Sequence, residues 1–329
     1  MVSLLQNLQS LFHPERFQGW GKKKKYFEGW YFKVVNDDAT RAFAFIPGIA
    51  MDNNGQAQAF IQVLDGMKKT AVYHRFNSSL FHPARNRFHV EIENNFFNSN
   101  AIRLSLPDAH GELTFTGNTP WPKRLYSPGI MGPYTFAPFM ECYHGIVSMD
   151  HSIQGSLCIQ GETINMDGGR GYIEKDWGHS FPSAYIWMQS NHFSVPGISL
   201  KSSVANIPWM GSSFVGFIAG LSLHGKIIPF TTYNGTKLLK CFADQDQVDI
   251  VLRNKQYTLE LHAKRDHATA LASPISGMMD GRIEESMTAE IHFSLTETQN
   301  RNTFVQDYSH RAAIEVAGNI ASILKTEQD

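Results

Sequence analysis

The chain has 329 residues, 42% of them hydrophobic, which suits one large or two medium-sized domains with substantial cores, and two are favoured. Its 29 basic and 30 acidic side chains nearly cancel, which argues against nucleic acid as a partner and against a general attraction to anionic membranes. Three scattered cysteines without a CxxC spacing argue against a disulfide framework and favour a reducing, cytoplasmic location.

The first predicted element is a short amphipathic helix over residues 3–12, within an N-terminal segment 1–21. Its apolar positions recur at helical spacing, and they are Leu4, Leu5, Leu8, Leu11 and Phe12. Its polar face carries no Lys or Arg, so packing on the protein is favoured, with weak peripheral membrane contact as the alternative. The N-terminus lacks the features of a secretory signal, and no apolar run approaches the roughly 20 residues of a membrane span.

From residue 26 onward apolar and polar residues alternate with a period of two, which is typical of half-buried strands. Turn signals separate short candidate strands, and no helical pattern lies between them, which favours an antiparallel meander that curls into a barrel or sandwich. The strands expected in the first half are 26–35, 41–46, 59–64, 71–76, 87–93, 102–106 and 113–116.

A segment with five prolines, 119–138, follows and cannot be a central strand, so it is expected to wrap over a surface or a barrel mouth. Strand patterns then resume, and together they predict an all-β chain of two barrel-like units: a first β domain over 22–182, a second over 183–320 and a tail over 321–329. The strands expected in the second half are 155–164, 185–193, 213–223, 227–233, 247–252, 257–262, 287–295 and 312–316.

The densest group of titratable and aromatic residues lies in 168–182. If residues 172–177 form a strand, Tyr172, Glu174 and Asp176 share one face, while Ile173, Lys175 and Trp177 occupy the other. Two neighbouring carboxylates sheltered from water repel each other, which raises the pKa of one and makes it a proton donor. The alternative is that both carboxylates are structural and close the end of a barrel.

The next predicted strand carries an aromatic and amide stripe, because Trp187, Gln189 and Asn191 project to one side. Such a stripe suits a pocket with an apolar wall and a few orienting hydrogen bonds. The alternative places Trp187 in a core and both amides in solvent. His179 and His192 are further candidates for proton transfer.

Other chemistries have little support in the sequence. None of the 14 histidines stands in an HxH or HExxH spacing, so no metal site is predicted. There is no GxSxG elbow, and Cys142 and His144 are close only in sequence, which is weak support for a nucleophilic pair.

Several motifs carry a resemblance to a known family. The runs GYIEKDWG at 171–178, FP at 181–182 and WMQSNHF at 187–193 resemble the signature of tocopherol cyclases and their bacterial relatives. Supporting matches are YFEGWYFK at 26–33, IPGI at 46–49, PFMECYHG at 138–145 and IPW at 207–209. The chain is therefore identified as a member of the tocopherol cyclase-like family, over residues 26–318.

This resemblance implies a lipocalin-like double barrel that encloses a hydrophobic isoprenoid or prenylquinol, a fold also found in carotenoid hydratases and some Diels–Alderases. It implies closure of a chromanol ring without a redox cofactor. Because the chain begins close to the first motif, without a transit-like extension, we expect a bacterial or otherwise unprocessed protein. Two alternatives to the cyclase stay open: a non-catalytic lipocalin-like carrier and an isoprenoid hydratase.

Site roles follow from the resemblance together with the alternation. Asp176 or Glu174 is the expected acid, and Tyr172, Gln189 and Asn191 are expected to orient the quinol. Either Trp187 or Trp177 is expected to face the cation formed from the prenyl chain. The further residues expected to line the substrate site are His179, Glu141 and Trp30.

Overall fold

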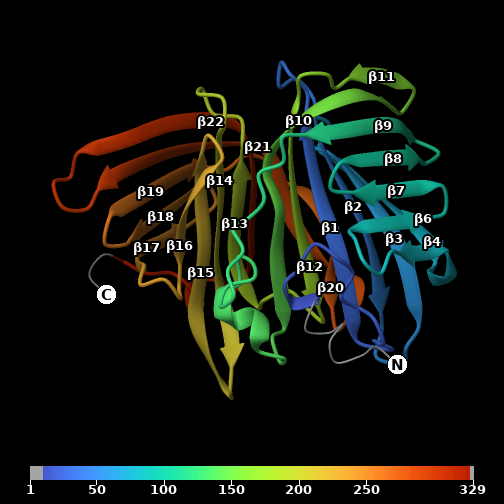
Figure 1. Cartoon of the computed structure of the whole chain (residues 1–329), viewed down its shortest axis with the longest axis horizontal. Coiled ribbons are helices and arrows are strands. Elements are labelled where there is room, and N and C mark those ends of the chain that lie inside the picture. Colours follow the sequence, from blue (N-terminus) through green and yellow to red (C-terminus); the bar gives the residue numbers. More distant parts are fainter. Residues whose placement is uncertain (1–9, 327–329) are drawn as a thin grey trace. The chain divides into compact units, whose positions relative to one another are not determined.

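The computed structural model describes residues 10–326, and in this part the protein is all-β (Figure 1), as the sequence predicts. Apart from residues 10 and 11, which are α-helical, the helical residues of this part form short 3-10 turns, η1 (Ser78–Leu80), η2 (Gly132–Phe136) and η3 (Ile320–Ser322). The short helix predicted over 3–12 lies mostly outside the described residues; in its described part, residues 10 and 11 are helical. No helix among residues 10–326 is long and apolar enough to cross a membrane.

The chain divides into two compact units. Unit 1 comprises residues up to Phe181 together with Leu271–Arg282, and unit 2 comprises Pro182–Ala270 and the residues from Ile283 onward. The described residues form two extended antiparallel sheets of lipocalin-like character: the first lies in unit 1 and most of the second in unit 2, while residues 271–282 of the second sheet are assigned to unit 1. The domain limits 22–182 and 183–320 stay predictions.

The sheet of unit 1 has twelve strands in the order β4-β3-β2-β1-β12-β10-β9-β8-β7-β6-β5, with β11 paired to β10. The strand bounds are β1 (Tyr26–Val35), β2 (Ala42–Met51), β3 (Ala57–Asp65), β4 (Thr70–Asn77), β5 (Phe81–Pro83), β6 (His89–Ile92), β7 (Asn95–Asn98), β8 (Ala101–Ser105), β9 (Ala109–Thr116), β10 (Cys142–Ile159), β11 (Glu162–Asn165) and β12 (Arg170–Gly178). The segment expected at 155–164, with a turn at Gln160-Gly161, comprises the last residues of β10, the turn and most of β11; β10 itself is much longer than expected, because it begins at Cys142.

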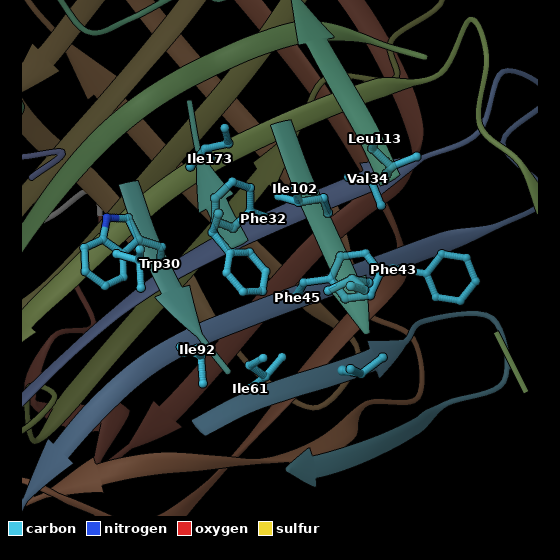
Figure 2. Close-up of a cluster of buried hydrophobic side chains, with 14 of the residues drawn as sticks. Trp30, Phe32, Val34, Phe43, Phe45, Ile61, Ile92, Ile102, Leu113 and Ile173 are labelled. Carbon is cyan, nitrogen blue, oxygen red and sulfur yellow. The ribbon is translucent and has the colours of Figure 1, made fainter. Parts of the chain in front are cut away.

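The core of unit 1 forms from the alternating apolar positions of its strands. Figure 2 shows Trp30 and Phe32 of β1 in this cluster together with Ile173 of β12. The ring of Phe32 lies 5.7 Å from that of Phe97 and 6.3 Å from that of Phe115, which joins β1 to β7 and β9. Because successive strand residues point to opposite faces, this packing directs the other residues of β1 and β12 away from the core.

The second sheet has ten strands in the order β16-β15-β14-β13-β22-β21-β19-β18-β17, with β20 paired to β21. Its strands are β13 (Ala184–Ser190), β14 (Ile198–Trp209), β15 (Ser212–Leu223), β16 (Lys226–Thr231), β17 (Lys237–Ala243), β18 (Gln247–Arg253), β19 (Tyr257–Lys264), β20 (Thr269–Ile275), β21 (Met278–Glu297) and β22 (Thr303–Gly318). Ile186 and Met188 of β13 enter the apolar cluster of unit 2, so the residues between them face the other side.

Candidate functional site

Strand β12 places the predicted catalytic residues on the face opposite the core. Ile173 and Trp177 belong to the apolar cluster of unit 1, which leaves Tyr172, Glu174 and Asp176 together on the other face of the strand. The strand lies between β1 and β10. This central position fixes the three side chains by pairing on both sides.

These side chains form one connected group with His144 of β10, which lies directly opposite Asp176 in the strand register. The Tyr172 hydroxyl donates to Glu174 Oε2 at 2.5 Å. The His144 ring has Nδ1 2.8 Å from Asp176 Oδ1 and Nε2 3.4 Å from Glu174 Oε2. We call Tyr172, Glu174, Asp176 and His144 the β12 cluster. The imidazole therefore lies close to both carboxylates, which strand alternation alone predicts only to share a face.

Access to the β12 cluster is graded along the strand. Tyr172 is fully buried and Glu174 is buried, whereas the Asp176 side chain keeps 24% of its surface exposed and that of His144 keeps 12%. Burial, and after it the Glu174 carboxylate, raise the pKa of Tyr172 well above its usual value. The phenol thus stays protonated as a hydrogen-bond donor, and Asp176 is the carboxylate most open to an incoming molecule.

Two other chemistries can be weighed at the same place. Burial, and next the Asp176 carboxylate, raise the pKa of Cys142 well above its usual value, so its thiol is a poor nucleophile. His144, Glu174 and Asp176 bring one ligand atom each within 4.8 Å of the others, which is close enough to hold a metal ion. In this arrangement His144 Nδ1 lies 2.8 Å from Asp176 Oδ1, whereas Nε2, 3.4 Å from Glu174 Oε2, has no hydrogen-bond partner among the described residues.

Trp30 and Trp177, which were expected to line the site, lie instead on the core side of the sheet. There they surround Lys175, whose ammonium is 5.0 Å from the Trp30 ring and 4.4 Å from the Trp177 ring. Lys175 forms a fully buried ion pair with Glu28 at 2.5 Å and donates to the Pro14 carbonyl at 2.9 Å. The β12 strand separates this ion pair from the β12 cluster.

His179 and Glu141 lie just past the ends of β12 and β10. The His179 amide donates to the Glu141 carbonyl at 2.9 Å, which continues the strand pairing beyond Asp176. Burial raises the pKa of the Glu141 carboxyl, while burial and then the charge of Lys25 lower the pKa of His179. Both residues are near the exposed end of the cluster in sequence, yet no hydrogen bond joins either side chain to it among residues 10–326.

The predicted stripe on β13 faces away from the core of unit 2. Trp187, Gln189 and Asn191 are all buried, with 6%, 0% and 5% of their surface exposed, so the two amides do not face solvent. Gln189 pairs in register with Lys201 of β14, and Trp187 pairs with Glu315 of β22.

Two charged residues beside this stripe were absent from the sequence prediction. Glu315 accepts a hydrogen bond from the Tyr185 hydroxyl at 2.8 Å, and fully buried Lys201 donates to Ser203 Oγ at 2.7 Å. They come from β22 and β14, where sequence spacing gives no sign of their neighbours on β13. The face is thus aromatic and polar, with charges of both signs.

Comparison with known proteins identifies related sequences and folds. The model of the family described as tocopherol cyclase-like matches residues 118–318. A chloroplastic protein of Oryza sativa subsp. japonica described as a probable tocopherol cyclase is 24% identical over 196 residues, which cover 55% of this chain and 40% of that protein. The chloroplastic tocopherol cyclase of Zea mays is 24% identical over 216 residues, covering 60% of this chain and 43% of that protein.

The match therefore spans less than half of either plant protein. Among solved structures, the crystal structure of CghA with Sch210972 aligns with a TM-score of 0.55 and 12% identity over 89% of this chain and 88% of that chain. At this identity the likeness concerns the fold alone. It agrees with the two lipocalin-like units described above.

Proposed function

Because the chain belongs to the tocopherol cyclase-like family, we propose that it is an enzyme that closes a prenylated benzoquinol, or a related isoprenoid, to a chromanol. The observation that carries this proposal is the β12 cluster, in which His144 lies between the partly exposed Asp176 and the buried Glu174. A protein that only stores an apolar molecule has no need for desolvated carboxylates, whose burial is costly.

The proposed reaction is an isomerisation. A proton adds to the trisubstituted double bond of the prenyl chain next to the ring and leaves a tertiary cation. The phenolic oxygen then attacks this carbon, a C–O bond forms, and the phenolic proton is released. The protein must therefore supply one proton and accept one, and no redox cofactor is required because no electrons are gained or lost.

We assign the proton donor to Asp176, with His144 as its positioning residue. Asp176 is the more exposed of the two carboxylates, whereas Glu174 already accepts a hydrogen bond from Tyr172. His144 Nδ1 lies 2.8 Å from Asp176 and is the group placed to return a proton to it after each turnover. Glu174, which accepts a hydrogen bond from Tyr172, lies 3.4 Å from the other ring nitrogen of His144, and its charge is proposed to help orient the imidazole.

Unit 2 has proposed binding residues of its own, on the face around β13. Trp187 offers an aromatic surface to a carbocation, and Gln189 and Asn191 offer amides to the hydroxyls of a quinol. Conservative variants of Gln189 and Asn191 to Glu and Asp test this assignment, since they keep the side-chain size and remove the amide donors. A raised KM without a matching fall in kcat is expected for a binding role.

Product analysis distinguishes the proposed cyclase from the two alternatives. The purified full chain is incubated with a phytyl-benzoquinol under reducing conditions, and the products are separated and identified by mass spectrometry. A chromanol of unchanged mass supports the cyclase, and a product heavier by one water indicates a hydratase. Binding seen by native mass spectrometry without any conversion indicates a carrier and contradicts the proposal.

A further inference from the structure

Exposed hydrophobic side chains gather on the long connection between β9 and β10, residues 117–141 (green in Figure 1). Among residues 10–326, nine large hydrophobic side chains are exposed, and four of them belong to this one connection. Leu125 and Tyr126 are the most exposed of the four, at 84% and 61%, and Phe139 and Phe136 follow at 53% and 45%. The other five are distributed over unrelated turns and strands, and they are Val195, Met210, Ile275, Phe304 and Leu324.

Leu125 and Tyr126 occupy the corner of a tight turn. The backbone groups of Arg124 and Ser127 exchange hydrogen bonds of 2.8 and 3.0 Å across it. Corners of this kind are usually occupied by Gly, Asn, Asp, Pro or Ser, so two large apolar residues here are unusual. We call Leu125 and Tyr126 the turn tip.

The turn tip is held out from the protein by buried residues on both sides. Trp121 before the turn is 5% exposed, Ser127 after it is 7% exposed and Ile130 is fully buried. The Ser127 hydroxyl donates to the Gly129 carbonyl at 3.2 Å. The exposure of the tip therefore comes from a defined local structure with buried anchors.

Positive charge flanks the turn tip. Lys123 and Arg124 directly precede it and are exposed. The Arg124 guanidinium donates to the Tyr126 hydroxyl at 2.9 Å, and Lys123 forms an ion pair with Glu15 at 3.0 Å. An exposed run of four lysines, 22–25, adds further positive charge to unit 1. Tyrosines and basic residues of this kind are typical of the region where a protein meets lipid head groups.

We propose that the turn tip inserts into a lipid bilayer surface that carries anionic head groups. A stable protein interface covers about 800 Å² on each partner, which is far more than two side chains at a corner supply. A bilayer needs no matching surface: Leu125 enters the acyl region, the Tyr126 hydroxyl stays at the head groups, and Arg124 contacts lipid phosphate. This inference goes beyond the proposed reaction and does not depend on it.

Vesicle flotation tests the proposal. The full chain is mixed with vesicles of phosphatidylcholine alone or with added phosphatidylglycerol, and the fraction that floats gives a partition coefficient. Replacing both tip residues, Leu125→Ser with Tyr126→Ser, should lower partitioning into the phosphatidylglycerol vesicles by about tenfold for each side chain. The matched control is Met210→Ser, because Met210 is 83% exposed and also lies at a tight turn, between β14 and β15.

The outcomes separate the proposal from its rivals. The proposal is supported if the wild-type chain floats with phosphatidylglycerol vesicles and this flotation weakens with salt. The flotation should also fall in the tip variant and persist in Met210→Ser. The tip variant retains residues 1–12, so its loss of binding cannot be attributed to the predicted N-terminal helix. The proposal is overturned if the wild-type chain does not float, if it floats equally with both vesicle types, or if the tip variant floats as the wild type does. Equal thermal midpoints of the three proteins exclude unfolding as a cause.

Discussion

His144 and Asp176 face each other across the paired strands β10 and β12, with Nδ1 and Oδ1 2.8 Å apart. The other ring nitrogen of His144 approaches Glu174, at 3.4 Å. A single imidazole therefore contacts one carboxylate that is open to solvent and one that is buried. This relationship underlies the two proposed roles: Asp176 contacts the substrate, and His144 positions Asp176.

The first prediction concerns His144. Its replacement by Gln keeps a hydrogen-bond donor beside Asp176 but removes the ring that connects the two carboxylates, so kcat should fall by about 100-fold or more while KM changes little. Steady-state kinetics measured from pH 5 to 9 give both quantities, and the pH profile of kcat should change as well. The matched control is His262→Gln, because His262 also bonds an aspartate, Asp249, at 2.6 Å but lies on the surface of unit 2. A purely structural His144 would leave the pH profile of kcat as in the wild type.

The second prediction concerns the ion pair on the core side of β12. Lys175→Met leaves the Glu28 carboxylate buried without its cation, so the free energy of unfolding should fall by about 3–5 kcal/mol. Urea denaturation measures this loss. Adding Glu28→Gln in the same chain removes the buried negative charge and should restore a large part of the stability. If the double variant is no more stable than Lys175→Met, the pair does not act as a charge-compensated unit.

The third prediction concerns pH and His151. Burial lowers the pKa of His151 to about 3, while a histidine in the unfolded chain titrates near pH 6.5, to within about one unit. Below that pH the unfolded chain binds a proton that the folded protein does not. The contribution of His151 to the free energy of unfolding is therefore fully present above about pH 6.5, and it is lost as the pH falls, by up to roughly 1.4 kcal/mol per pH unit.

Urea unfolding at pH 7 and pH 5 measures this loss. His151→Gln should show a shallower decline than the wild type, and His310→Gln, a change at an exposed histidine, should decline as the wild type does. An identical slope in wild type and His151→Gln would assign the acid sensitivity to other groups.

The fourth prediction concerns the turn between β20 and β21. Gly277 has φ of 94° and its amide donates to the His179 carbonyl at 2.6 Å, next to the end of β12. A Cβ here would lie 2.1 Å from the Met51 carbonyl oxygen, so Gly277→Ala should be severely destabilising. Gly225→Ala is the control: Gly225 has a similar φ of 83° but open space around it, and its substitution should cost only the backbone term of about 1 kcal/mol. Equal losses of unfolding free energy in the two variants would show that the close approach at Gly277 is of no consequence.

Period-two alternation was sufficient to predict the faces of β12 and β13, because both strands are regular and one side of each packs in a core. It did not reveal the first half of β10. That strand carries two register irregularities, between Ile146 and Ser148 and between Ser148 and His151, which interrupt the alternation. His144 lies in the part that was missed, so its contact with Asp176 could not be inferred, although its motif was recognised.

The position of Trp30 shows a second limit of the sequence. The face of the sheet on which the Trp30 side chain lies depends on the register of β1 against β12, which pairs Trp30 with Lys175. A pairing register of this kind is set by long-range contacts. Once the register is known, Trp30 must point to the core, because Lys175 does.

The most direct test of the central claim is chromanol formation from a phytyl-benzoquinol by three proteins: the wild type, Asp176→Asn and the control Asp249→Asn. We expect the wild type and Asp249→Asn to form the chromanol at equal rates, and Asp176→Asn to be slower by about 100-fold or more. Glu174→Gln, measured alongside, should lie between them. Chromanol formation by Asp176→Asn and Glu174→Gln at the wild-type rate, or no conversion by the wild type, would contradict the account.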